Sequence, residues 1–226
     1  PVITTASDVN NLPAIDEFAK KNNLAINDMQ KAKEFAVQML ETHHQGMPQN
    51  NCHAELVSAS PSKSLPQFSI SLYIKNDILN LVPQCVVLGI GCKRGKSAEE
   101  LQSFVCETLK IHEIDYRSVE KIASINLKKD ENAFLSLSES FKRPFVTFSA
   151  EELNAIPQKV SHSDFVSEIT GTDNVCERAV WAAGASEIII PKTVKDGMTL
   201  AVGVRKIEVK IPEELEKYKV SCDVDF

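Results

Sequence analysis

The chain has 226 residues, a formal net charge of -6, 43% hydrophobic residues and 25% charged residues. These values are typical of a soluble globular protein of one or two domains, with enough apolar residues to bury a core. The acidic balance argues against a general nucleic-acid-binding protein, which requires a basic face.

Six cysteines are spread along the chain without a C-x-x-C pair. This usage predicts reduced, mostly buried thiols and a cytoplasmic location. His43, His44, Cys52 and His53 are near neighbours, but their irregular spacing does not predict a metal site. No apolar run is long enough to span a membrane, so no membrane partner is expected. The start at Pro1, inside a structured pattern, indicates a fragment, so a missing signal peptide carries little weight.

Residues 1–45 are predicted to be the remnant of an N-terminal domain, small and helical, with its connecting helix. Residues 46–82 are predicted to be a linker or central segment, partly irregular, because polar and low-complexity stretches break the periodicity there. The elements expected in these two segments are a strand at 2–5, helices at 12–19 and 28–42, and a strand at 68–74.

Residues 83–212 are predicted to form an α/β domain, followed by a tail at 213–226. Because strands alternate with helices, we expect a mostly parallel sheet with helices on both faces. The pair Asp196–Gly197 predicts the turn of a C-terminal antiparallel hairpin. The expected strands are 86–90, 123–127, 145–148, 188–190 and 200–204, and the expected helices are 98–110, 118–122, 131–141 and 173–183.

A glycine-rich basic loop joins the strand at 86–90 to the helix at 98–110. A helix N-terminus reached through glycines is suited to an anionic group, and three loop cations in an acidic chain favour a small anionic ligand. Ser97 and Glu100 have the spacing of a capping box. The residues predicted to bind the ligand are Gly89, Gly91, Lys93, Arg94, Gly95 and Ser97.

The loop departs from both common nucleotide motifs. Its glycines have the spacing G-x-G-x-x-x-G, and no acidic residue follows a second strand about twenty residues on, as ribose binding requires. The triplet Gly95-Lys96-Ser97 lacks the first glycine of a P-loop, because Ile90 takes that place. A nucleotide-binding protein is therefore the least favoured alternative. A tight turn with solvated lysines is the alternative without any ligand.

The run 88–100 resembles the start of the C-terminal domain of the cobalamin-biosynthesis CbiG family, the cobalt-precorrin-5A hydrolases. The run 1–16 resembles the end of that family's N-terminal domain, most of which is expected to be absent here. The further blocks that agree, in the same order, are 123–131, 148–153, 171–179, and 190–192 with 199–202.

The resemblance implies a hydrolase of anaerobic cobalamin biosynthesis that opens the δ-lactone of cobalt-precorrin-5A and releases acetaldehyde to give cobalt-precorrin-5B. Its partner would be this polycarboxylate tetrapyrrole. Because the cobalt arrives with the substrate, no cofactor and no protein metal site are expected. A homodimer, or contact with other enzymes of the pathway, is a further option. The alternative is a non-catalytic corrinoid-binding module, since the domain also resembles a stand-alone relative of the aerobic pathway.

The substrate carboxylates suggest roles for the loop. Arg94 is expected to grip a carboxylate in a bidentate way, while Lys93 and Lys96 supply point charge. The main-chain N–H groups of residues 97–99 are expected to receive another carboxylate.

The catalytic candidates are Glu177, Lys129 and Lys192, which fall at junctions between strands and helices. Each has a structural alternative: a first-turn carboxylate favoured by the helix dipole for Glu177, a solvated turn residue for Lys129, and a surface lysine for Lys192. His112 and His162 are further candidate bases, but each stands alone. The sequence does not assign the base.

Overall fold

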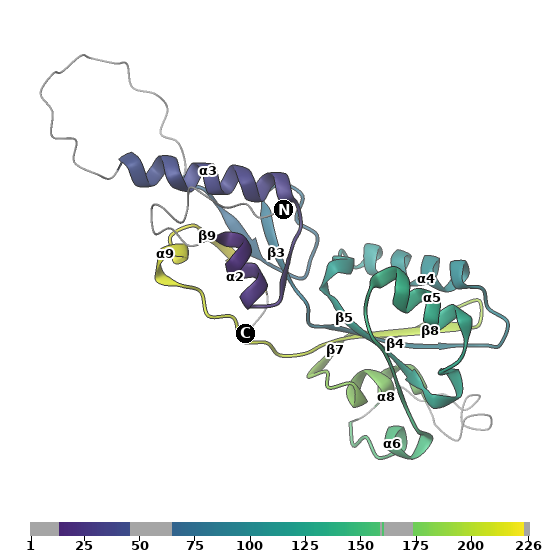
Figure 1. Ribbon diagram of the computed structural model, residues 1–226. Helices are drawn as coiled ribbons and strands as arrows, with labels where there is room; N and C mark the ends of the chain where they lie inside the picture. Colours follow the sequence, from purple (N-terminus) through teal and green to yellow (C-terminus); the bar gives the residue numbers. More distant parts are fainter. Residues whose placement is uncertain (1–13, 46–64, 159, 161–173, 224–226) are drawn as a thin grey trace, which may run out of the picture. The chain divides into compact units, whose positions relative to one another are not determined.

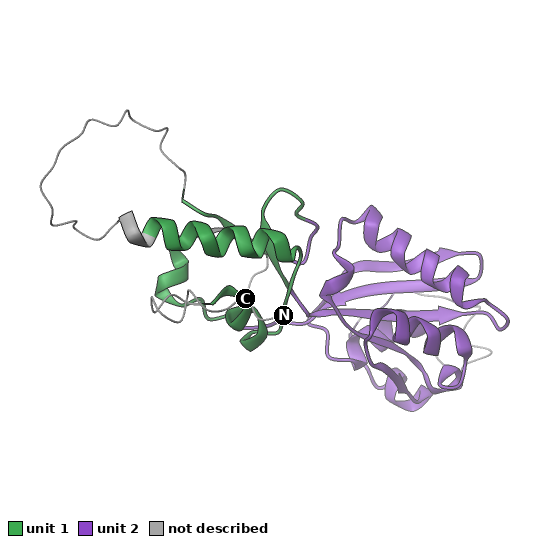
Figure 2. Ribbon diagram, turned by 45° about the horizontal axis from the view of Figure 1, so that its top comes forward, with its two compact units in different colours: residues 1–71, 75–82, 209–224 green, residues 72–74, 83–208, 225–226 purple. Residues whose placement is uncertain are grey.

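The computed structural model describes residues 14–45, 65–158, 160 and 174–223 (Figure 1). The chain divides into two compact units (Figure 2). The first unit comprises residues 1–71, 75–82 and 209–224, and the second comprises residues 72–74, 83–208 and 225–226. The first unit therefore combines segments from both ends of the chain. The strand expected at 2–5 and most of the expected linker lie outside the described residues.

The first unit is built on a four-stranded sheet with the order β1-β3-β2-β9. β2 is parallel to both of its neighbours. The helix α3 buries Ala32, Phe35 and Met39, whose spacing places them on one face. The elements of this unit are α2 (Ile15–Lys21), β1 (Leu24–Ile26), α3 (Met29–Gln45), β2 (Phe68–Ile70), β3 (Leu79–Pro83), α9 (Glu213–Glu216) and β9 (Lys219–Cys222).

Three short strands of this unit were not predicted. β1 has three residues, β3 lies in the segment predicted as linker, and β9 lies in the segment predicted as tail. β9 pairs with β2, which is far from it in sequence. Strands of three to five residues carry too little periodicity to be recognised without their partners.

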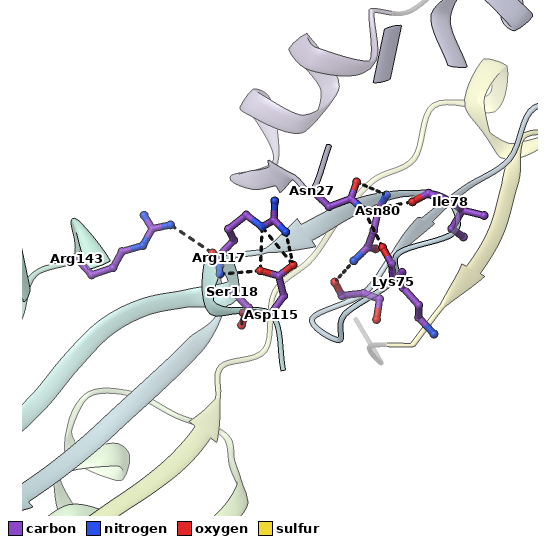
Figure 3. Close-up of polar contacts among 9 residues, drawn as sticks. Asn27, Lys75, Ile78, Asn80, Asp115, Arg117, Ser118 and Arg143 are labelled. Carbon is purple, nitrogen blue, oxygen red and sulfur yellow. Dashed lines mark hydrogen bonds and ion pairs between the residues drawn. The ribbon is translucent and has the colours of Figure 1, made fainter. Parts of the chain in front are cut away.

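A half-buried Asn27 and a buried Asn80 fix the turn between β2 and β3 (Figure 3). The side-chain amide of Asn27 donates to the carbonyl oxygens of Lys75 at 2.8 Å and Ile78 at 3.2 Å. Its oxygen accepts the N–H of Asn80 at 2.9 Å. The Asn80 side chain in turn accepts the Ser69 hydroxyl at 2.8 Å. These bonds compensate the burial of polar groups inside the sheet.

The second unit is built on a five-stranded sheet with the order β6-β5-β4-β8-β7. β4, β5 and β6 are parallel, and β8 is antiparallel to both β4 and β7. Figure 1 shows α4 and α5 on one face and α6 and α8 on the other. The predicted fold class is confirmed. The elements are β4 (Val86–Cys92), α4 (Ala98–Ile111), β5 (Val119–Ile125), α5 (Asn132–Phe141), β6 (Phe145–Phe148), α6 (Ala150–Asn154), α8 (Val175–Ala182), β7 (Glu187–Lys195) and β8 (Met198–Val204).

The helix predicted at 118–122 is wrong, because these residues belong mostly to β5. A short 3-10 turn over Tyr116–Ser118 precedes the strand, and Asp115 caps it by accepting the Arg117 N–H at 2.9 Å (Figure 3). The Arg117 guanidinium also contacts the Asp115 carboxylate, at 2.9 Å from Nε and 3.0 Å from Nη2. Pairing with β4 and β6 outweighs the local helical spacing.

Candidate functional site

The segments that carry the candidate residues meet the five-stranded sheet at its carboxyl edge. β7 runs in the same direction as β4, because β8 is antiparallel to both, so their carboxyl ends share one edge. Open α/β sheets place their ligand sites at this edge. The segments that meet the sheet there are 93–97 after β4, 126–131 after β5, 196–197 between β7 and β8, and 174–177 at the start of α8.

The glycine-rich loop ends in a complete capping box. The Ser97 hydroxyl accepts the Glu100 N–H at 3.1 Å, and the Glu100 carboxylate accepts the Ser97 N–H at 3.0 Å. The same carboxylate pairs with the Lys96 ammonium at 2.8 Å. Gly95 turns the chain into the helix with a φ of 84°. The expectation that the N–H groups of residues 97–99 receive a ligand is therefore wrong for Ser97, whose N–H Glu100 occupies.

Lys93 and Arg94 are the exposed cations of this loop. In the part of the chain that the structure describes, the Arg94 side chain has no hydrogen-bond or ion-pair partner. The Lys93 N–H donates to the carbonyl oxygen of Gly197 at 2.9 Å, which ties the loop to the hairpin turn. A planar guanidinium fork suits a carboxylate, so the carboxylate grip expected of Arg94 stays a prediction.

Gly89 and Gly91 lie on the α8 face of β4, and an added Cβ would meet different neighbours at the two positions. A Cβ on Gly89 would stand 1.9 Å from the Cys176 carbonyl oxygen, so α8 packs directly on the strand's main chain. A Cβ on Gly91 would stand 2.7 Å from the Thr199 Oγ1, which occupies the space a side chain would need. The structure therefore gives Gly89 a packing role, and it places Gly91 nearer the edge on the same face.

The first turn of α8 holds a buried carboxylate. Asn174 caps the helix from a left-handed conformation with a φ of 49°, and its side chain accepts the Glu177 N–H at 3.3 Å. Glu177 is only 3% exposed. A carboxylate in the first turn is favoured by the helix dipole.

Glu177 also binds β7 at a bulge. The three-residue step from Ile190 to Thr193 lies opposite a two-residue step on β8, so β7 carries an extra residue there. Lys192 lies in this bulge, and its N–H donates to the Glu177 carboxylate at 2.8 Å. The structure thus brings together Glu177 and Lys192, two candidates that lie in different elements.

Cys176 lies beside this pair and is almost completely buried. Burial raises the pKa of its thiol to about 12, although a hydrogen bond with Thr199 and the charge of Lys192 act in the opposite direction. A thiol with such a pKa stays protonated and is a poor nucleophile at neutral pH. Cys176 therefore belongs to the packing of α8.

Lys129 lies apart from the Glu177–Lys192 pair. Its side chain is 66% exposed and faces Asp130 at 3.9 Å. The same β5–α5 connection contacts Cys92 through Glu131, whose carboxylate also pairs with Lys128 at 2.5 Å. Because Cys92 follows Gly91, it points to the opposite face of β4 from the glycines. The three catalytic candidates are therefore not in one cluster.

Other candidates fall elsewhere. His112 is the C-terminal cap residue of α4, at the far end of that helix from the loop. His162 lies outside the described residues. The described part of the chain holds no group of three or more side chains suited to a metal ion. None of its helices combines the length and apolar character that crossing a membrane requires.

Thr199 and Asn174 were not predicted as members of the site. They reach the site because α8 packs against β4 and β8, and the residues next to them in the sequence do not indicate this packing. A partial signal is the pair Gly89 and Gly203, since a Cβ on Gly203 would also meet α8, at 2.3 Å from Val180 Cγ1. Glycines inside two buried strands indicate close approach of another element.

Residues 86–203, more than half of the chain, match the family described as "Cobalamin synthesis G C-terminus". The chain belongs to this family. The predicted resemblance is confirmed over the five-stranded unit, and the match ends within β8.

Two curated relatives named cobalt-precorrin-5A hydrolase match most of the chain. The protein from Salmonella typhimurium is 29% identical over 223 residues, which cover 90% of this chain and 64% of the relative. The protein from Priestia megaterium is 27% identical over 231 residues, which cover 90% of this chain and 61% of the relative. The chain thus spans less than two thirds of the length of either relative.

A solved structure has the fold of the five-stranded unit. CobE, described as a protein from the cobalamin (vitamin B12) biosynthetic pathway, superposes with a TM-score of 0.51 at 28% identity. The match covers 56% of this chain and 94% of CobE. The domain therefore exists in CobE nearly without additional chain.

Proposed function

We propose that this chain is part of a cobalt-precorrin-5A hydrolase and that its five-stranded unit binds the carboxylate side chains of the corrin precursor. The observation that carries the proposal is the pair of exposed cations, Lys93 and Arg94, at the carboxyl edge of a domain from this family. The relatives named for this activity support the reaction class.

The substrate chemistry matches the charges at the edge. A tetrapyrrole ringed by acetate and propionate groups offers several carboxylates at once. Arg94 would bind one of them with two parallel hydrogen bonds, and Lys93 would add a point charge. The cobalt ion belongs to the substrate.

Lactone opening needs a water molecule, a base to take its proton, and a cation or donor for the developing oxyanion. Opening leaves a carboxylate and an alcohol. The alcohol then gives up its hydroxyl proton as the carbon–carbon bond to the macrocycle breaks. The alcohol carbon leaves with its methyl group as acetaldehyde, and the bonding electron pair stays on the macrocycle, which takes up a proton. Lys192 is our candidate for oxyanion stabilisation, and Glu177 is our candidate base; Lys129 lies apart from this pair and is not assigned a role with them. The contact of Glu177 with the Lys192 N–H supports an alternative role for Glu177, which is to hold β7 in place.

The decisive experiment measures acetaldehyde released from cobalt-precorrin-5A by this chain and by the full-length protein. Release by either protein is the expected result. The variant Arg94→Ala should weaken substrate affinity by about 1–3 kcal/mol, the scale of a charge-assisted pair. Lys110→Ala is the matched control, because Lys110 is an exposed cation in the last turn of α4. Equal affinity of the two variants would contradict the role of the loop.

The second candidate function is a corrinoid-binding module without turnover. This second function is favoured by the match with CobE. The match covers 94% of CobE, so the same domain occurs there with little other chain. Binding of cobalt-precorrin-5A without acetaldehyde release, by the chain and by the full-length protein, would establish this alternative. Absence of binding would reject both functions.

A further inference from the structure

The hairpin turn between β7 and β8 reaches the end of β4 and touches Lys93. Met198 is paired with Cys92, so the turn residues stand opposite the first loop residue after β4. The Lys93 N–H donates to the Gly197 carbonyl oxygen at 2.9 Å. Asp196 and Gly197 both have positive φ angles, 49° and 77°, as a two-residue hairpin turn requires.

Gly197 also leaves room for the side chain of Lys93. A Cβ at this position would stand 2.9 Å from the Lys93 Cδ and 3.2 Å from its Cγ. The aliphatic stem of Lys93 therefore lies across the glycine. Asparagine also tolerates a positive φ, so the turn by itself would accept it. The turn alone already favours glycine at this position, and the contact with the Lys93 stem adds a steric reason.

The turn also brings a carboxylate to the cation loop. The charge of Asp196 contributes to raising the pKa of Lys96, after the larger effect of the hydrogen bond to Glu100. The hairpin thus acts on the loop through a main-chain bond, a steric contact and a charge.

We infer that the Asp196–Gly197 turn positions Lys93 for a substrate carboxylate, with Gly197 as the positioning residue. This inference rests on the proposed function. A lysine stem held against a glycine loses less rotamer freedom when its ammonium binds a ligand, so the turn strengthens binding without contacting the substrate. Gly197 contributes to affinity only through Lys93.

A double-mutant cycle in the full-length protein tests the inference. Gly197→Asn keeps a turn-compatible residue and adds a Cβ against the lysine stem. Lys93→Ala removes the stem. Each single variant should raise the KM for acetaldehyde release about tenfold while kcat stays unchanged, because uniform binding is lost. The double variant should bind no more weakly than Lys93→Ala alone. Additive losses, or an unchanged KM for Gly197→Asn, would overturn the inference.

The same cycle measured in unfolding separates this inference from the proposed function. Gly197→Asn should lower the folding equilibrium constant several-fold more in the wild-type background than in Lys93→Ala. Lys93→Met keeps much of the stem without the charge, so it should retain this coupling but bind substrate as weakly as Lys93→Ala. Gly184→Asn is the matched control, since Gly184 has a φ of 91° and no atom within 4 Å of a built Cβ.

The outcomes are distinct. In the first outcome, the unfolding cycle shows coupling but the wild-type protein does not bind cobalt-precorrin-5A. The proposed function then fails, and the Lys93–Gly197 contact is only structural, which rejects the positioning role. If wild-type protein binds and the unfolding cycle shows no coupling, the positioning inference fails and the proposed function stands. Coupling in both measurements supports both.

Discussion

The two faces of β4 differ in how closely a helix approaches the strand. Toward α8 the strand presents Val87, Gly89 and Gly91, and at Gly89 the helix main chain rests on the strand itself. Toward α4 and α5 it presents Leu88 and Ile90, which are fully buried. The first face brings main chain against main chain at Gly89, next to the buried Val87, whereas the second fills space with side chains alone.

The difference shows how one strand serves both stability and a site. On the α8 face, close packing brings the first turn of the helix to the sheet, and with it Glu177 and its bond to Lys192. On the other face, side chains supply apolar burial, which is the main favourable contribution to folding. A glycine is needed where an element must approach, and a large residue is needed where space must be filled.

The largest effect should come from adding one methyl group to the glycine face. Gly89→Ala places a Cβ against the Cys176 carbonyl oxygen, which cannot move without shifting α8. We expect a loss of about 4 kcal/mol in the free energy of unfolding, at the upper end for overpacking. Urea unfolding followed by the fluorescence of Trp181 measures it. Gly95→Ala is the control, because a Cβ there meets nothing within 4 Å, and it should cost about 1 kcal/mol.

Removing side-chain volume from the opposite face should have the next largest effect. Leu88→Ala leaves a cavity in a fully buried place. We expect it to lower the free energy of unfolding by about 3 kcal/mol. The same titration measures it. A loss smaller than that of Gly95→Ala would contradict the view that this face is stabilised by filled space.

Substitutions of Glu177 distinguish its two possible roles, which are to hold β7 in place and to act as the catalytic base. Glu177→Ala removes the acceptor of the Lys192 N–H and should cost about 2 kcal/mol. Glu177→Gln keeps an acceptor oxygen, so it should retain most of this stability. If Glu177 is the base, the glutamine variant folds but releases no acetaldehyde. If Glu177 only positions β7, the glutamine variant keeps most of its activity.

The smallest effect concerns pH and the thiol on the glycine face. The pKa of Cys176 is about 12 in the folded protein, against 9.0 for the unperturbed group. At high pH the unfolded chain releases this proton before the folded chain does, so stability falls as pH rises through about 9. We expect a loss of about 1 kcal/mol between about pH 8 and about pH 10. Cys176→Ser should reduce this dependence, and an identical pH profile would contradict it.

Much of the five-stranded unit could be predicted because its signals are local. The capping box at Ser97 and the Asp196–Gly197 turn each depend on residues within one turn of each other, and both form. The alternation of strands and helices predicted the sheet class. The strand β5 was mistaken for a helix at its start, because its pairing partners outweigh a short helical spacing.

The candidate site could be predicted only in part. The sequence placed cations next to a helix N-terminus, and Lys93 and Arg94 are exposed there. It did not reveal that Glu100 takes the Ser97 N–H from any ligand. Nor did it separate Lys129 from Lys192, since both follow or end strands and their spacing along the chain says nothing of which face they reach.

The sequence by itself determined the glycine-rich loop, its cap and the hairpin, because each is set by hydrogen bonds and dihedral angles among neighbouring residues. The tertiary structure decided what the glycines are for. Gly89 admits a helix, and Gly197 admits the stem of Lys93, from segments distant in the chain. It also decided that β9 completes the first sheet. Contacts between distant segments depend on the packing of whole elements, which no local pattern encodes.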